Sequence, residues 1–235
     1  LLFKQFGGDS IVDATSLGPA RDPVGLARIS RATGLNVIMG ASYYVGSSHP
    51  PEMDQITEDE LFENIVRDLT EGVDRTSIKP GIIGEIGCTW PMTDNECKVL
   101  LASGRAQKAT GVPLHIHPGR DERAPFHILD MLDGVGADLS KVIMGHIERT
   151  FFEKNLLKQL AKRECYLEWD LFGNERSYYT APDLDVTRDL PNDSTRMDQI
   201  GWLASEGFGN KIVVSHDIAY KYQFTHHAGY SYHYI

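Results

Sequence analysis

The sequence predicts an α/β fold of parallel strands, and three observations support this prediction. Apolar runs typical of strands alternate with helical patterns from one end of the chain to the other, in seven βα-type repeats. Both faces of each expected strand are apolar, as in a parallel sheet that is covered by helices. No linker or change of composition interrupts the repeats. An open doubly wound sheet and a (β/α)8 barrel both fit this pattern.

Each expected strand is a short apolar run followed by a helical pattern, so right-handed crossovers can connect the parallel strands. The phosphate-binding pattern G-x-G-x-x-G is absent after the first strand, which weakens a nucleotide-binding doubly wound sheet. The spaced glycines of the third expected strand lie within the strand and do not open a helix. The expected strands cover residues 10–16, 35–44, 81–88, 113–119, 141–148, 165–173 and 210–220.

The helical segments carry recognisable start and stop signals. Asp22 can cap the first helix, Pro23 occupies its first position, and Gly34 follows its end. Thr57 and Glu60 have the spacing of a capping box at the start of the second helix. The expected helices cover residues 22–33, 57–73, 94–111, 124–136, 151–164 and 194–208.

The composition predicts a soluble globular protein, with 41% hydrophobic and 24% charged residues among 235. No apolar run of about 18 residues occurs, so we expect no membrane contact. A net charge of −10 and the lack of a basic stripe argue against nucleic acid as a partner. The three cysteines fit neither a disulfide framework nor a Cys-x-x-Cys zinc site, which favours reduced thiols and a cytoplasmic location.

Ionisable residues lie at or near the C-terminal ends of five expected strands: Glu85, His117, His146, Asp170 and Asp217. Each could be structural, as a satisfied histidine, a helix cap or half of an ion pair. Burying such groups without partners would cost about 1–3 kcal/mol or more each. In a barrel the C-terminal strand ends meet at one mouth, where these side chains would form a site for Zn²⁺, Mn²⁺ or Co²⁺. This argument favours the barrel.

The stretch GVPLHIHPGR places His115 and His117 on one face of an expected strand, because side chains alternate along a strand with period two. Either histidine could be a metal ligand or a hydrogen-bonded residue of the barrel interior. His115 is expected about 6–7 Å deeper than His117, two strand residues back. The stretch therefore raises the hypothesis of a metal site without deciding it.

Four segments, GEIG, GVPLHIHPGR, VIMGHIERT and IVVSHDI, resemble in order and spacing the phosphotriesterase-related proteins. These belong to the amidohydrolase superfamily of (β/α)8 metal-dependent hydrolases. The resemblance covers essentially the whole chain and implies strands two to eight of a TIM barrel, without its first strand and its last helix. The chain also begins without Met inside an apparent helix, so we interpret residues 1–235 as a single barrel domain and a piece of a longer protein.

The resemblance implies a site for two divalent metal ions, with Zn²⁺ as the main expectation. Glu85 matches a carboxylate that bridges the two ions, and His117 and His146 match the histidines of the more exposed ion. Asp217 matches an aspartate that holds the buried ion and takes a proton from the bridging hydroxide, and His115 then belongs to a second layer or to the barrel interior. In the family, a His-x-His at the end of the first strand also binds the buried ion. Residues 1–9 contain no such strand, so we expect the 235 residues alone to lack a complete two-metal site and to be inactive.

The resemblance further implies amide hydrolysis of small N-acyl amino acids or amino sulfonates, N-acetyltaurine among them. Two positions differ from true phosphotriesterases, because Leu171 replaces a relay histidine and Arg149 replaces an acidic residue. The alternatives are a lactonase, a carboxylesterase or a phosphotriesterase with the same metals. A non-catalytic binding protein on the barrel scaffold is the alternative from a different class.

Further candidates for substrate binding lie on loops after the expected strands. Arg120, Arg149 and Arg176 would suit a small anionic substrate. Trp90 and Tyr178 would line the wall of the pocket. Each arginine could instead be a solvated surface charge, and each aromatic residue could serve packing alone. A homodimer is the other partnership that we expect.

Overall fold

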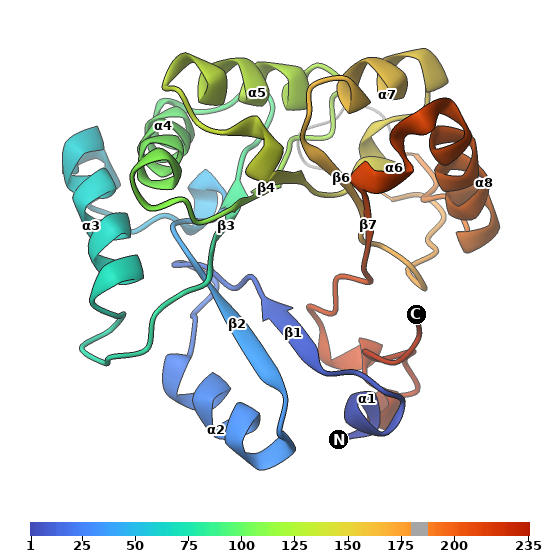
Figure 1. Ribbon diagram of the computed structural model, residues 1–235, viewed down its shortest axis with the longest axis horizontal. Helices are drawn as coiled ribbons and strands as arrows, with labels where there is room; N and C mark the ends of the chain where they lie inside the picture. Colours follow the sequence, from blue (N-terminus) through green and yellow to red (C-terminus); the bar gives the residue numbers. More distant parts are fainter. Residues whose placement is uncertain (180–187) are drawn as a thin grey trace.

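The computed structural model describes residues 1–179 and 188–235, which contain one parallel sheet of seven strands. The strands lie side by side in sequence order, in an arc with helices on its outer side (Figure 1). A doubly wound sheet would reverse its strand order at a switch point, so this order confirms the predicted incomplete barrel. The strands are β1 Ser10–Asp13, β2 Asn36–Ala41, β3 Ile82–Gly87, β4 Leu114–His117, β5 Val142–Met144, β6 Tyr166–Trp169 and β7 Ile212–Val214.

The helices start and stop at the predicted signals. Asp22 accepts a hydrogen bond from the backbone N–H of Gly25 at 2.8 Å, and Gly34 ends the same helix with a φ of 70°. Thr57 and Glu60 form the expected capping box. The α-helices are α1 Leu2–Gln5, α2 Pro23–Thr33, α3 Glu58–Thr70, α4 Asp94–Thr110, α5 Ala124–Gly134, α6 Ile147–Thr150, α7 Lys154–Ala161 and α8 Asp193–Leu203. Short 3₁₀ turns cover Gly46–Ser48, Met53–Gln55, Leu139–Lys141, Gly209–Lys211, Lys221–Gln223 and Thr225–His227, and a π turn covers Ala204–Phe208.

The observed strands stop several residues before the ends that the sequence predicts. The strand expected over residues 141–148 ends at Met144, and His146 has a φ of 57° and precedes α6. Asp217 has a φ of 42° and lies beyond the end of β7. These residues leave the extended conformation, so the backbone turns and aims their side chains across the mouth of the arc.

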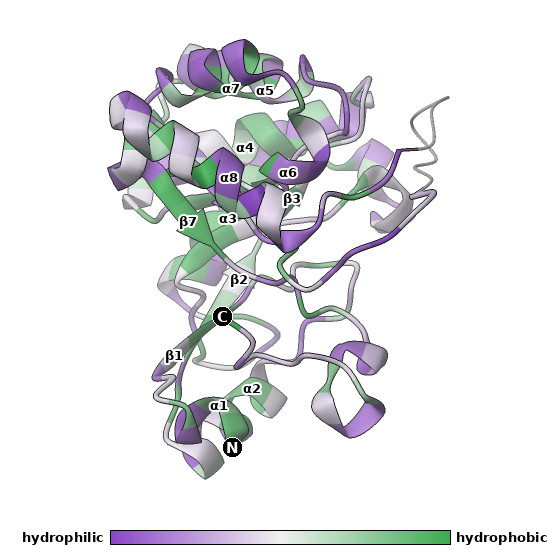
Figure 2. Cartoon of the chain, turned by 90° about the vertical axis from the view of Figure 1, so that its right-hand side faces the viewer, coloured by the Kyte–Doolittle hydropathy of each residue, from purple (hydrophilic) through white to green (hydrophobic). Residues whose placement is uncertain are grey.

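The core lies between the sheet and the outer helices. Ile83, Ile116, Met144 and Leu167 are fully buried side chains on four consecutive central strands. The strands are mainly apolar and the outer helices mix apolar with polar residues (Figure 2). Burial of this apolar surface is the main stabilising contribution to the fold. The edge strands are less covered, and Val214 of β7 is 48% exposed.

Glu96 connects the start of α4 with two loops at the C-terminal edge of the sheet. Its side chain is fully buried and completes a second capping box with Thr93. One carboxylate oxygen accepts from the backbone N–H of Gly46 at 2.8 Å. The other accepts from the backbone N–H of Thr89 at 3.2 Å and of Thr93 at 3.0 Å. The same carboxylate therefore fixes the loops after β2 and β3 against α4.

The three cysteines are free thiols, in agreement with the sequence. Cys88 and Cys165 are buried and Cys97 is half-buried. Burial raises the pKa of Cys165 to about 12, so this residue remains a neutral thiol at pH 7. Among the helices of residues 1–179 and 188–235, none combines the length and apolar content that crossing a bilayer requires.

Replacing Glu96 with Ala should destabilise the protein far more than replacing Glu60 with Ala. Glu96→Ala leaves the N–H groups of Gly46 and Thr89 without their acceptor, at about 1–3 kcal/mol for each buried group that loses its partner. Glu60→Ala disrupts only the local capping box of an exposed helix start. Urea unfolding followed by circular dichroism measures the difference, and equal losses in the two variants would contradict this role of Glu96.

Candidate metal centre

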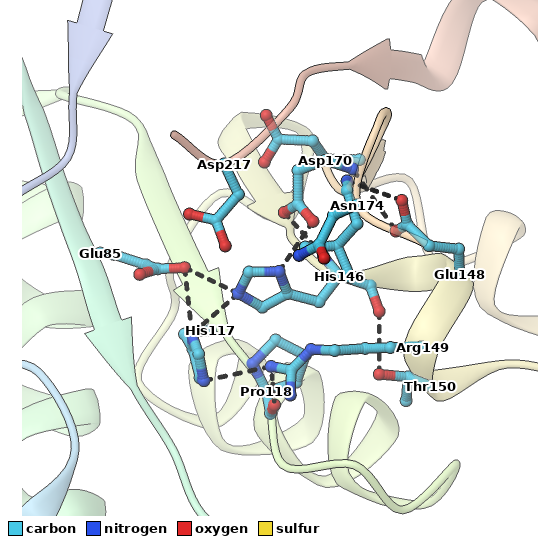
Figure 3. A network of polar contacts seen from close by, with 12 residues as sticks. Glu85, His117, Pro118, His146, Glu148, Arg149, Thr150, Asp170, Asn174 and Asp217 are labelled. Atoms are coloured by element: carbon cyan, nitrogen blue, oxygen red, sulfur yellow. Dashed lines mark hydrogen bonds and ion pairs between the residues drawn. The ribbon is translucent and has the colours of Figure 1, made fainter. Parts of the chain in front are cut away.

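The structure brings together the four residues that the sequence singles out as metal ligands. Glu85 lies in β3, His117 ends β4, His146 follows β5 and Asp217 follows β7. Their side chains point toward one another from these separate segments (Figure 3). The parallel order of the strands produces this arrangement, because all C-terminal strand ends open on the same side of the sheet.

Three of these side chains present donor atoms to one point. The Oε1 atom of Glu85 is 3.1 Å from Nδ1 of His117 and 3.0 Å from Nε2 of His146. The two imidazole nitrogens are 2.8 Å apart. A carboxylate oxygen with two imidazole nitrogens is a donor set typical of Zn²⁺ and related divalent ions. The residues present therefore fit a metal ion at this point.

The charges of this group favour a cation. Burial alone would raise the pKa of Glu85, but His117 and His146 outweigh it and hold that pKa well below its usual range. Burial lowers the pKa of His117 to about 3, so its imidazole is neutral, as a metal ligand must be. Burial and Arg149 oppose the charge of His146, but Asp170 and Glu85 raise its pKa to about 10. A metal ion would replace the proton that His146 holds.

Asp170 sets the orientation of the His146 ring. One carboxylate oxygen of Asp170 is 2.7 Å from Nδ1 of His146, and the other accepts from the backbone N–H of His146 at 2.9 Å. The opposite nitrogen, Nε2, therefore faces Glu85 and His117 (Figure 3). Histidines that bind metals commonly donate their second N–H to a carboxylate, which fixes the tautomer and the ring. The sequence places Asp170 at a strand end but assigns it no such role.

A buried network of polar contacts holds Asp170 in turn. Glu148 of α6 accepts from the backbone N–H of Leu171 at 2.8 Å, and Arg196 of α8 lies 3.4 Å from the same Glu148 carboxylate. Arg196 also contacts Asp193, and its side chain is completely buried. Burial and the charge of Asp170 raise the pKa of Glu148 to about 8. Glu148 is not among the residues that the sequence pattern singles out, although it follows His146 by only two positions.

Asp217 faces this group but belongs to no three-ligand set among the described residues. The residue is exposed at its surface, and the neighbouring protein partly desolvates its carboxylate. This desolvation, with the charges of Asp170 and Glu85, raises the pKa of Asp217 to about 6 despite the opposing charge of His146. A carboxylate with a pKa near neutrality is suited to accept and return a proton. Among the described residues, Glu85, His117 and His146 therefore offer ligands for one cation, and Asp217 places a further carboxylate beside them.

His115 lies two residues before His117 and belongs to a different contact. Its Nε2 atom is 2.6 Å from a carboxylate oxygen of Glu168. Burial opposes the charge of His115, but Glu168 outweighs it and raises the pKa to about 9. His115, Glu168 and Asp170 are close enough to hold a metal ion. The pairing of protonated His115 with Glu168 instead indicates an ion pair in the interior, which is one of the two places expected for His115.

Tyr44, Arg149 and Arg120 lie along the side of the site next to His117. The Tyr44 hydroxyl is 3.1 Å from Nδ1 of His117, and Nη2 of Arg149 is 3.1 Å from Nε2 of the same ring. Arg120 donates to the hydroxyl of Tyr179 at 2.8 Å. Tyr44 was not expected, because an aromatic residue at the end of an apolar run carries no sequence signal of a polar role.

The other candidates for substrate binding make their described contacts elsewhere. Trp90 packs edge to face on His127, with ring centroids 5.8 Å apart. Arg176 is exposed and donates to the hydroxyl of Tyr222. Tyr178 is 82% exposed. Within the described contacts these three residues do not meet Glu85, and their roles in substrate binding stay predictions.

The whole chain matches one known protein family, since residues 1–235 match the family described as the Phosphotriesterase family. The chain belongs to the phosphotriesterase family. This family member is 43% identical over 235 residues to a protein from Xenopus tropicalis named N-acetyltaurine hydrolase. The match covers 100% of this chain and 66% of that protein. The chain therefore spans about two-thirds of the length of the curated relatives that it matches.

Two solved structures share the fold of this family member. A resiniferatoxin-binding protein from Rhodobacter sphaeroides superposes with a TM-score of 0.93 at 35% identity, covering 99% of this chain and 64% of that chain. A lactonase from Listeria monocytogenes superposes with a TM-score of 0.86 at 26% identity, covering 99% and 72% respectively. These similarities support the barrel architecture that the strand order indicates.

Asp170→Asn should weaken Zn²⁺ binding about 10- to 100-fold, because the ring of His146 loses the carboxylate that orients it. His146→Ala removes a ligand atom and should weaken binding further. His226→Ala, on an exposed turn, is the matched control and should leave the affinity unchanged. Isothermal titration with Zn²⁺ measures all three variants. Wild-type affinity in Asp170→Asn would show that Asp170 does not position the ligand.

Proposed function

We propose that the protein is a metal-dependent hydrolase that cleaves the amide bond of small N-acyl amino acids or amino sulfonates, such as N-acetyltaurine. The convergence of Glu85, His117 and His146 on one point carries this proposal. Membership of the phosphotriesterase family and the relative named N-acetyltaurine hydrolase support it. We further propose two divalent ions per protein, with Zn²⁺ favoured over Mn²⁺ or Co²⁺ by the imidazole and carboxylate donors.

Each residue of the site has a defined task in this reaction. Divalent ions supply an activated water at neutral pH and polarise the carbonyl of the substrate. Glu85, His117 and His146 would hold the metal. Asp217 takes the proton from the attacking water and returns it to the leaving nitrogen, for which a pKa of about 6 is well matched. Asp170 keeps His146 oriented while these charges change.

The substrate class follows from the charge beside the ligands. Arg149 and Arg120 place cations on the side of the site next to His117, which suits an anionic substrate. Lactone hydrolysis is the second candidate, because the lactonase from Listeria monocytogenes has the same fold. A purely binding role is the third, in view of the relative described as a resiniferatoxin-binding protein.

We also propose a cytoplasmic location, which the three free thiols favour. The net charge of −10 makes nucleic acid an unsuitable partner. A homodimer remains a proposal that sedimentation of the purified protein would test.

A substrate panel separates the candidate functions. A longer protein that contains these 235 residues, with the remaining third of its relatives' length, should when loaded with Zn²⁺ release acetate from N-acetyltaurine and N-acetyl amino acids faster than it opens simple lactones. Removing the metal with a chelator should abolish the activity, and added Zn²⁺ should restore it. Faster turnover of lactones would favour the lactonase, and a protein that binds metal but cleaves neither class would favour a binding role.

Asp217→Asn should lower kcat about 10²- to 10⁴-fold, because the amide cannot accept the proton from the attacking water. Glu85→Gln should lower activity by orders of magnitude and also reduce the metal content, because a neutral amide binds cations poorly. Steady-state kinetics with metal analysis of each variant distinguishes the two effects. If both variants keep wild-type turnover, the assignment of these residues is wrong.

A further inference from the structure

Arg149 is a buried cation without an anionic partner among the described residues. It is only 5% exposed. Its Nη2 atom is 3.1 Å from the carbonyl oxygen of Pro118 and 3.1 Å from Nε2 of His117. Its Nε and Nη1 atoms are buried and have no hydrogen-bond partner. A buried guanidinium with unsatisfied N–H groups is costly unless an anion binds to it.

The surroundings of Arg149 make one side of the site positive. Burial and the nearby charge of Arg120 both lower the pKa of Arg149, although an arginine stays charged at neutral pH. Arg120 also contacts the ring of Tyr179, 5.3 Å from the ring centroid. The carboxylates of Glu85 and Asp217 lie on the other side of the His117 and His146 rings in Figure 3. The site is therefore polarised, with cations at one end and carboxylates at the other.

Arg149 also lies very close to the metal ligands. Its guanidinium touches Nε2 of His117, whose Nδ1 is 3.1 Å from the Glu85 carboxylate. Only the width of one imidazole separates the guanidinium from the ligand atoms. A substrate that spans both points must carry its negative group a few bonds from its reacting carbonyl.

We propose that Arg149 binds the oxyanion of the substrate, a sulfonate or a carboxylate, through Nε and Nη1, and that its distance from the ligands restricts the enzyme to short spacers. This inference rests on the proposed function and adds the residue that selects the substrate. Each of these two unpartnered N–H groups can donate a charge-assisted hydrogen bond to an oxygen of such an anion. Arg149 acts in recognition and takes no part in proton transfer.

Steady-state kinetics on matched substrates tests the role of Arg149. The substrates are N-acetyltaurine, its neutral analogue N-acetylethanolamine, and N-acetyl-6-aminohexanoate, which carries a longer spacer. Arg149→Met should raise KM for N-acetyltaurine about 10- to 100-fold, the loss expected for a charge-assisted hydrogen bond, with kcat changed only a few-fold. KM for N-acetylethanolamine should stay the same. The wild type should prefer the short acidic substrate to the long one.

Two further variants serve as controls. Arg31→Met removes the same charge from an exposed position on α2 and should leave all constants unchanged. Arg149→Lys keeps the charge but lacks the Nε and Nη1 donors, so its KM for N-acetyltaurine should lie between those of the wild type and Arg149→Met. The metal content of each variant shows whether the neighbouring His117 still binds the metal.

A binding measurement separates this inference from the proposed function. Ethanesulfonate should bind the Zn²⁺-loaded wild type in an NMR titration and should bind Arg149→Met at least about 10-fold more weakly. This result would support the role of Arg149 even if the wild type cleaved no amide, an outcome that would refute only the proposed function. Equal binding to both proteins, equal KM changes for acidic and neutral substrates, or a loss confined to kcat would overturn the inference.

Discussion

The hydrogen bond between Asp170 and His146 is the interaction on which the candidate site depends. It takes up Nδ1 and the backbone N–H of His146, so that Nε2 faces Glu85 and His117. The bond is itself supported from behind, because Glu148 holds the backbone beside Asp170 and pairs with a buried arginine on α8. The buried ionisable side chains from β3 to α8 thus contact one another through hydrogen bonds or opposite charges. These contacts offset the cost of removing the groups from water at one end of the sheet.

Most of the fold could be predicted from the sequence, because hydrophobic periodicity and capping residues are local signals. All seven expected strands are present, and the caps at Asp22 and Thr57 form as expected. The strand ends could not be predicted, since His146 and Asp217 adopt left-handed backbone conformations that an apolar run does not reveal. The expected last helix also changes into a π turn after Leu203.

The candidate ligands could be predicted because ionisable residues at the ends of apolar strands are unusual, and a parallel sheet gathers those ends. The supporting residues could not. Tyr44 and Glu148 have no distinctive spacing, and their contacts arise only when distant segments pack. Contacts between loops were the least predictable, since Arg176 pairs with Tyr222, far along the chain, and no local sequence signal announces this contact.

His146 and Arg149 are separated by a single turn, formed by the four residues of α6. The candidate metal ligand His146 and the cation beside it consequently belong to one short helical turn, anchored by Glu148 within that turn. Divergence of specificity in many barrel enzymes proceeds by exchange of whole loops, which leaves catalysis untouched. Replacing the segment from His146 to Arg149 as a whole would also remove the candidate metal ligand. A change of substrate preference therefore requires single substitutions in this segment, or changes in the longer loops that face it.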